Sequence, residues 1–268
     1  MNLNRLKNAL DSQAGGLTRN RVLLASTDST NAVARRIVKS FLDADARPPS
    51  FLVVAVQQLA GRGRLTREWV SQPDMGAYLS VVTVARGQDE LASLPLLVGA
   101  GLSRKISEIC GCRCRLKWPN DLMVAGRKIG GILIECVTRG QAPSSAVIGI
   151  GVNYAGSGKV SAVGGIGMDE ITLELPELPD VVADIATAVD DELQHIGDLP
   201  YAVARCRDAS EHRPGDPIRF RTGAGVQEGT FMRIDERGRL ILRRSGGGEM
   251  RLSAGDVVEE RTKERHGP

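Results

Sequence analysis

A stretch that alternates glycine with arginine, Gly-Arg-Gly-Arg-Leu-Thr-Arg at 61–67, combines two residue types suited to binding anions. Glycine lets the backbone approach a ligand closely, and its N–H group can face an anion. Arginine offers a planar fork of donors that matches a carboxylate or a phosphate. A solvated basic turn explains this stretch, taken alone, equally well. The stretch is neither a P-loop, because the Gly-Lys-Ser/Thr ending is missing, nor a dinucleotide fingerprint, because its glycines are wrongly spaced.

Residues 117–121, Lys-Trp-Pro-Asn-Asp, gather a cation, an amide and a carboxylate within five positions. Such a set can serve a phosphate and Mg²⁺ together. Pro119 restrains Trp118 to an extended or turn conformation. An Asx turn beside a core tryptophan explains the same residues, and from composition alone it is the better explanation because such turns are common.

Glycines also interrupt two expected strands that carry polar side chains at their ends. Lys128 precedes a pair of glycines and an apolar run, which indicates close approach of a ligand or of another backbone. A β-bulge with a surface lysine is the alternative. The segment 149–153, Gly-Ile-Gly-Val-Asn, repeats the pattern and ends in an amide. The polar group at 28–31, Asp-Ser-Thr-Asn, precedes a helical pattern and can cap that helix while also binding a ligand.

The elements that must position these groups belong to an ordinary globular chain. Its 268 residues predict one large and one small domain, and 42% hydrophobic with 25% charged residues is typical of a soluble fold. The net charge of +3 is too small to indicate a nucleic-acid or membrane partner. No apolar run approaches the roughly 20 residues of a membrane span, and residues 1–15 lack the apolar core of a signal peptide. A cytoplasmic protein is expected.

Five cysteines, an odd number, argue against a disulfide framework. Cys110, Cys112 and Cys114 alternate with other residues, and this spacing differs from the Cys-x2-Cys of zinc sites. Alternation predicts that all three lie on one face of a strand and pack as small hydrophobic residues.

Apolar periodicity predicts an α+β arrangement before residue 212. Helical spacing covers 28–42, 93–110 with Pro95 near its start, and 182–196. Strands are expected at 51–56, 78–84, 112–117, 121–125, 129–137 and 146–152. Residues 1–19 carry little information.

The pattern changes after about residue 211 to short β runs separated by glycine-containing turns. These runs, with a hairpin turn at 235–238 between two of them, lie at 218–221, 229–234, 240–243 and 250–253. They predict a small all-β barrel of about fifty residues. The expected domains are 1–211, which carries the motifs above, and 212–268.

These motifs, in this order, resemble the biotin protein ligase family over nearly the whole chain. The resemblance rests on Ser29-Thr30-Asn31, on Gln58 through the glycine–arginine stretch to Trp69, on 117–121, on 128–133 and on 149–153. The pair Lys-Trp-Pro-Asn-Asp and Gly-Arg-Gly-Arg is highly specific to that family. Because the N-terminal segment is too short for a winged helix, the resemblance is to its monofunctional type.

The resemblance implies a role for each matching residue. The biotin site would comprise Ser29, Thr30 and Gln58 at the ureido head, Gly61 and Gly131 lining the slot, and Arg62 and Lys128 at the carboxylate. The nucleotide site would comprise Arg64, Asn120, Lys128 and Asn153, with Asp121 at Mg²⁺. Lys128, Arg62 and Arg64 would form the catalytic set, since they would hold two anions together.

The family fold is a mixed β-sheet flanked by helices, of the class II synthetase type, followed by an SH3-like β-barrel. The implied activity uses ATP and Mg²⁺ to convert biotin into biotinoyl-AMP, and then transfers biotin to a lysine of a biotin carboxyl carrier protein. The protein is expected to work as a monomer or a homodimer. No covalent nucleophile is evident in the motifs.

Two features depart from the family pattern. Thr66 stands where the glycine–arginine loop usually has another glycine, and residues 154–167 match no recognised part of the nucleotide cover. A lipoate ligase or octanoyltransferase of the same fold is the alternative function, which the two specific motifs disfavour. A regulator that binds biotinoyl-AMP and DNA is disfavoured by the small net charge and the absence of a helix-turn-helix pattern.

Overall fold

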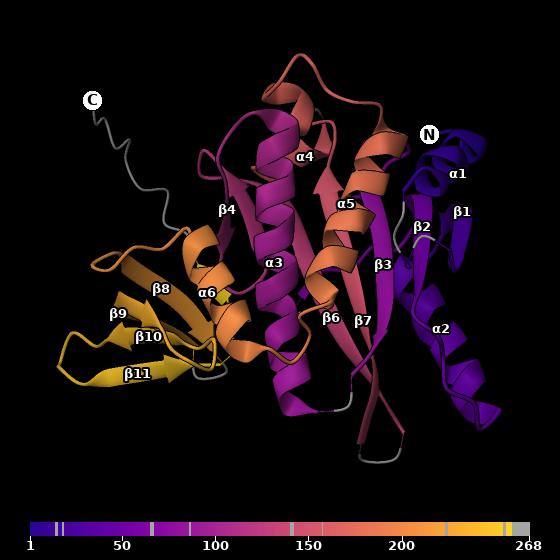
Figure 1. Ribbon diagram of the computed structural model, residues 1–268. Coiled ribbons are helices and arrows are strands. Elements are labelled where there is room, and N and C mark those ends of the chain that lie inside the picture. Colours follow the sequence, from indigo (N-terminus) through magenta and orange to yellow (C-terminus); the bar gives the residue numbers. More distant parts are fainter. Residues whose placement is uncertain are drawn as a thin grey trace.

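A seven-stranded sheet forms the body of the protein in a computed structural model (Figure 1). The structure describes residues 1–13, 16–17, 19–64, 67–85, 87–139, 142–156, 158–222, 225–253 and 256–258. The strands are β1 Arg21–Thr27, β2 Phe51–Gln58, β3 Gly76–Val84, β4 Cys114–Lys117, β5 Asp121–Val124, β6 Arg127–Arg139 and β7 Ala142–Asn153. Their order across the sheet is β1-β2-β3-β7-β6-β5-β4. Only β1 and β2 pair in parallel among these described neighbours, so the sheet is mixed as expected.

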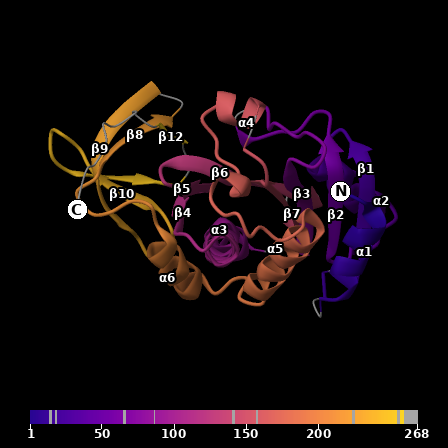
Figure 2. The same ribbon diagram turned by 90° about the horizontal axis from the view of Figure 1, so that it is seen from above.

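Helices cover both faces of this sheet. They are α1 Leu3–Asp11, α2 Thr30–Asp43, α3 Gln88–Cys110, α4 Lys159–Ala162, α5 Leu178–Leu193 and α6 Leu199–Ala209, with a 3₁₀ turn η2 at Met168–Glu170. Figure 2 shows α3, α5 and α6 gathered on one side. Alternation along β2 explains the two layers, because Leu52 packs into the cluster that contains α3 and α5, whereas Val53 packs against Val38 of α2.

On the α2 face, side-chain volume falls toward the point where that helix begins. Along β7, Val147 packs beneath α2, while Gly149 and Gly151 follow on the same face. Along β3, Val82 is followed on this face by Ser80, which pairs with Gly149. The sheet is therefore hollowed beside the N-terminus of α2.

A second, five-stranded sheet follows α6. Its strands are β8 Pro217–Thr222, β9 Gly225–Ile234, β10 Leu240–Arg243, β11 Glu249–Leu252 and β12 Asp256–Val258, in the order β11-β10-β9-β8-β12. This confirms the small all-β unit, while its closure into a barrel stays a prediction. The indole Nε1 of Trp118 donates to the carbonyl of Gly238 at 2.9 Å, and one apolar cluster runs from α3 into Phe220 and Leu240. The domain boundary at residue 211 therefore also stays a prediction.

The prediction that three cysteines share one strand face was wrong. Cys110 ends α3, Gly111 adopts a left-handed conformation after it (φ 61°), and Cys114 begins β4. Their expected packing as buried hydrophobic groups holds for Cys110 and Cys114, whose thiol pKa values burial raises to about 12. All five cysteines are free, and no group of three potential metal ligands occurs in the described ranges.

Other elements were not anticipated. The helix α3 starts before residue 93 and carries Pro95 in its interior, and α1, β1 and α6 had no clear sequence signal. In the part of the chain that is described, no helix combines the length and apolar character needed to cross a bilayer.

Candidate active site

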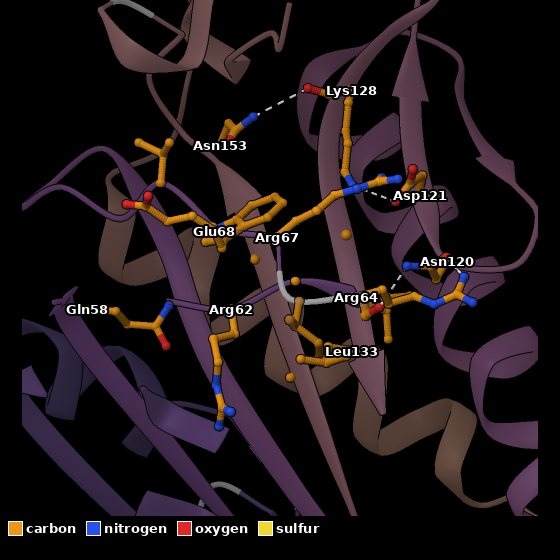
Figure 3. Close-up of a pocket in the computed structure, with 18 of the residues that line it drawn as sticks. Gln58, Arg62, Arg64, Arg67, Glu68, Asn120, Asp121, Lys128, Leu133 and Asn153 are labelled. Atoms are coloured by element: carbon orange, nitrogen blue, oxygen red, sulfur yellow. Dashed lines mark hydrogen bonds and ion pairs between the residues drawn. The ribbon is translucent and has the colours of Figure 1, made fainter. Parts of the chain in front are cut away.

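A cavity of about 340 Å³ lies on the hollowed face of the sheet (Figure 3). Ten of the sequence-predicted site residues line it: Ser29, Thr30, Gln58, Arg62, Arg64, Asn120, Asp121, Lys128, Gly131 and Asn153. The remaining one, Gly61, lines an adjoining recess together with Ser29 and Arg62. The motifs are far apart in sequence, and the strand order of the sheet brings them together.

The N-terminus of α2 forms one wall of the cavity. Ser29 precedes the helix, and its backbone N–H donates to the Asp28 carboxylate at 2.8 Å. The Arg36 guanidinium pairs with that carboxylate and, with the Ser29 N–H, holds the pKa of Asp28 well below its usual range. The Gln58 side chain at the end of β2 accepts from the Thr30 backbone N–H at 2.9 Å through Oε1, and its Nε2 donates to Ser71 Oγ at 3.0 Å. Backbone and side chains thus fix the polar groups at this wall.

A buried polar chain lies behind that wall, and the sequence motifs did not reveal it. Ser80 Oγ, fully buried on β3, lies 2.7 Å from Thr30 Oγ1 and 2.6 Å from Asn31 Oδ1. Asn31 Nδ2 donates to Glu135 at 2.8 Å, and Arg35 donates to the other carboxylate oxygen of Glu135 at 2.8 Å. A Cβ at Gly149 would lie 2.4 Å from Asn31 Oδ1, so this glycine makes room for the chain.

The described residues of the glycine–arginine stretch, 61–64 and 67, and the Glu68 that follows lie antiparallel to each other as the two arms of a narrow hairpin. Arg62 and Glu68 form an antiparallel bridge, and Gly63 N–H donates to the Arg67 carbonyl at 2.8 Å. Arg64 reaches across the cavity and donates to Asn120 Oδ1 at 2.8 Å (Figure 3). Leu65 and Thr66, including the departure from the family pattern at residue 66, lie outside the described residues.

Trp69 follows this hairpin and covers the glycine-bearing strands. A Cβ at Gly151 would lie 2.4 Å from its ring, and one at Gly131 would lie 3.4 Å from Cζ3. The ring centroid is 5.5 Å from Lys128 Nζ. Its indole Nε1 is buried and has no hydrogen-bond partner in the described structure. The glycines of β6 and β7 therefore accommodate an aromatic side chain as well as a ligand, which the sequence signal did not distinguish.

Lys128 and Asp121 form an ion pair at the opposite wall. Lys128 Nζ donates to Asp121 Oδ1 at 2.5 Å, and the two side chains are 37% and 26% exposed (Figure 3). Asn120 Nδ2 donates to the Ile132 carbonyl at 3.0 Å, which leaves Oδ1 turned toward Arg64. Asn153 is buried and donates to the carbonyls of Ile166 and Lys128 at 3.1 and 3.3 Å.

Three members of the Lys-Trp-Pro-Asn-Asp motif, Lys117, Trp118 and Pro119, are not among the residues that line the cavity. Lys117 is 8% exposed, and the interpretation that it acts with Asn120 and Asp121 on a phosphate stays a prediction. It lies near partly buried His212, whose pKa is lowered to about 4 by burial and by the Lys117 charge. The motif therefore divides between the cavity and the junction with the C-terminal sheet.

The donor set can accept Mg²⁺ only together with a ligand. No three potential metal-ligating side chains are grouped in the described ranges, and Asp121 is the carboxylate beside Lys128. Mg²⁺ commonly binds through one or two carboxylates plus substrate phosphates. Asp121 fits that kind of shared site.

Comparison with known proteins places the chain in a family. The model of the biotin/lipoate A/B protein ligase family matches residues 23–153. The biotin–[acetyl-CoA-carboxylase] ligase of Paracoccus denitrificans is 34% identical over 235 residues, which cover 84% of this chain and 95% of that protein. The ligase of the same name from Mycobacterium tuberculosis is 27% identical, and the match covers 92% of each chain.

Solved structures agree with the fold. A biotin protein ligase from Aquifex aeolicus in complex with biotin and ATP superposes with a TM-score of 0.74 at 23% identity, covering 91% of this chain and all of that one. A biotin protein ligase from Leishmania major in complex with biotinyl-5-AMP gives a TM-score of 0.58 at 25% identity, covering 88% and 99%. The chain therefore belongs to the biotin/lipoate A/B protein ligase family, and within it to the biotin protein ligases.

Proposed function

We propose that the protein is an ATP-dependent biotin protein ligase, which forms biotinoyl-AMP and transfers biotin to a lysine of a biotin carboxyl carrier protein. The observation that carries the proposal is the composition of one cavity. Hydrogen-bonding groups of Thr30 and Gln58 lie at one wall, and the cations Lys128 and Arg64 lie at another. A ligand with a polar head and an anionic tail suits this arrangement. Relatives named for biotin ligation support the choice of substrate.

The first step joins two anions. One oxygen of the biotin carboxylate attacks the α-phosphorus of ATP, the new C–O–P linkage forms, and pyrophosphate leaves with the electron pair of the broken P–O bond. Lys128 would contact both the carboxylate and the α-phosphate, while Arg62 and Arg64 would neutralise the phosphate charge that opposes their approach. Bound Mg²⁺ would supply further neutralisation of the phosphates, with Asp121 as its protein ligand.

The remaining proposed contacts follow the walls of the cavity. The biotin head would contact Ser29, Thr30 and Gln58, and its ring would lie between the backbones of Gly61 and Gly131. The nucleotide would contact Arg64, Asn120, Lys128 and Asn153. Asn153 Nδ2 is already committed to two carbonyls, so Asn153 would act through its Oδ1 or through the backbone that it holds.

The second step transfers the acyl group. The neutral amine of a carrier lysine attacks the carbonyl carbon, a C–N bond forms, the C–O bond to AMP breaks, and the amine loses a proton. The mixed anhydride is destroyed by water, so a hairpin that covers it would preserve it. The hydrogen bond from Arg64 to Asn120 supports this role, because it links the hairpin to the wall that carries Asn120.

A lipoate or octanoate ligase is the alternative, and it is not favoured. A dithiolane or an alkyl chain offers no hydrogen-bond donor to the polar wall at Thr30 and Gln58. We further propose a cytoplasmic enzyme, because the five free thiols suit a reducing compartment. Its partners would be biotin, ATP and the carrier domain, without nucleic acid or membrane, in a monomer or a homodimer.

The test is pyrophosphate release from ATP and Mg²⁺ with biotin, lipoate or octanoate, followed by intact mass of an added biotin carrier domain. Biotin alone should support release without the carrier, and the carrier should then gain one biotin. Release with lipoate or octanoate but not with biotin would contradict the proposal.

A further inference from the structure

We propose that Ser80, Asn31 and Glu135 set the direction of the hydrogen bonds at the head of the cavity, so that it selects ligands with N–H donors. The inference deepens the proposed function and rests on it. The three residues would act through Thr30 and Gln58, and are therefore positioning residues that determine specificity. The argument follows from which of their atoms can donate and which can only accept.

Glu135 fixes the orientation of the Asn31 amide. A carboxylate only accepts hydrogen bonds, and its second oxygen already accepts from Arg35 at 2.8 Å. The Asn31 atom that lies 2.8 Å from Glu135 must therefore be the donor Nδ2. The other amide atom, Oδ1, then faces Ser80 and can only accept.

Ser80 has two short contacts and one proton to donate. Because Asn31 Oδ1 only accepts, the 2.6 Å contact requires Ser80 to donate there. The 2.7 Å contact with Thr30 Oγ1 is then a hydrogen bond in which Thr30 donates and Ser80 accepts. The hydroxyl proton of Thr30 therefore points toward Ser80 and away from the cavity.

Gln58 is oriented by an independent donor. The Thr30 backbone N–H can only donate, so the Gln58 atom 2.9 Å away must be Oε1. Thr30 Oγ1 lies 3.1 Å from the same oxygen, which is a longer contact than its 2.7 Å contact with Ser80. Because the Thr30 hydroxyl donates its hydrogen bond to Ser80, Thr30 Oγ1 and Gln58 Oε1 are two neighbouring acceptors at the cavity wall.

Two neighbouring acceptors favour a ligand atom that donates. The ring N–H of a cyclic urea meets this requirement, whereas a dithiolane or an alkyl chain leaves both oxygens without a partner when water is displaced. A site built to bond a substrate N–H rejects analogues that lack it far more strongly than an apolar pocket discriminates by size. Ser80 and Glu135, which do not line the cavity, would thereby help to separate biotin from lipoate.

Ser80→Ala removes the acceptor that holds the Thr30 proton. That proton then turns to Gln58 Oε1, 3.1 Å away, and occupies a lone pair that the ligand would use. Loss of this bond should weaken biotin binding about tenfold to a hundredfold. Ser145→Ala is the matched control, because Ser145 is also fully buried in the same sheet, and its Oγ has no hydrogen-bond partner among the described residues.

The experiment measures binding by calorimetry for the wild type, Ser80→Ala and Ser145→Ala. The ligands are biotin, two analogues in which one or the other ring N–H is replaced by oxygen, and lipoate. We expect Ser80→Ala to weaken biotin binding but to leave unchanged the affinity for one of the analogues, the one that lacks the N–H facing Thr30 and Gln58. Ser145→Ala should resemble the wild type throughout. If Ser80→Ala does not fold, Ser80→Cys takes its place, because cysteine is similar in size to serine and is only a weak donor. It should show the selectivity expected of Ser80→Ala.

Two different failures are distinguishable. An equal loss of affinity for biotin and both analogues in Ser80→Ala would overturn the proposed direction of hydrogen bonds while leaving biotin as the substrate. Wild-type binding of lipoate without binding of biotin would overturn the proposed function, and the selection of N–H donors with it.

Discussion

Replacing Lys128 with alanine should slow biotin adenylation about a thousandfold. The Lys128 side chain is 37% exposed, so an effective dielectric constant of about 20 suits its surroundings. Two unit charges about 4 Å apart then interact by about 4 kcal/mol, and each 1.36 kcal/mol of transition-state energy corresponds to a factor of ten in rate. The assay is biotin-dependent pyrophosphate release, with Lys39→Ala on the exposed surface of α2 as the control for charge loss.

The ion pair with Asp121 allows a sharper version of this test. In Lys128→Ala the Asp121 carboxylate loses its partner 2.5 Å away and repels the incoming anions. The double variant Lys128→Ala with Asp121→Asn should therefore recover part of the lost rate when Mg²⁺ is saturating. Turnover of Lys128→Ala within a few-fold of the Lys39→Ala control would refute the assignment of Lys128 to the reaction.

Three further outcomes are expected. Arg62→Gly should loosen the hairpin over the anhydride, so that biotinoyl-AMP escapes and labels bystander proteins on a biotin blot; labelling confined to the carrier would contradict this. Trp118→Phe leaves the Gly238 carbonyl without its donor and should lower the free energy of unfolding by about 1–3 kcal/mol in a denaturant titration. An unchanged midpoint would mean that this bond does not contribute to the stability of the protein. Burial and the charge of Lys117 lower the pKa of His212 from 6.5 to about 4, so the unfolded chain binds a proton in this window that the folded chain does not. Stability should therefore fall by up to about 2.5 kcal/mol as the pH drops from about 7 to about 4.5, and His212→Phe should flatten that dependence.

The glycine-bearing strands were predictable because alternation and composition are local signals. Gly149 and Gly151 of β7 mark a place where the sheet needs space. Asn153 is the last residue of β7, and Lys128 lies near the beginning of β6. Residues far apart in sequence then meet because β6 and β7 pair directly, with Gly131 opposite Gly151. The sequence could predict the strands and the family pattern, while the pairing that forms the cavity is long-range.

Other features had no sequence signal that local reasoning can use. Ser80 is a single hydroxyl within an apolar strand, and its importance depends on Asn31 and Thr30 reaching it from a helix. The alternating cysteines resembled a strand because spacing alone does not show that Gly111 ends a helix between them. Spacing alone also does not show that Lys117 is buried near His212, a residue far from it in the sequence.

The bond between Trp118 and Gly238 has a consequence for how the protein is made. Its two partners are 120 residues apart, so the indole leaves the ribosome well before the carbonyl that accepts its N–H. At about 5–20 residues per second this interval is on the order of ten seconds. During that time α3 and the β4–β5 turn present an apolar surface that Phe220 and Leu240 have yet to cover. We expect nascent chains stalled before residue 238 to bind chaperones or be degraded, and not to accumulate as a smaller active ligase.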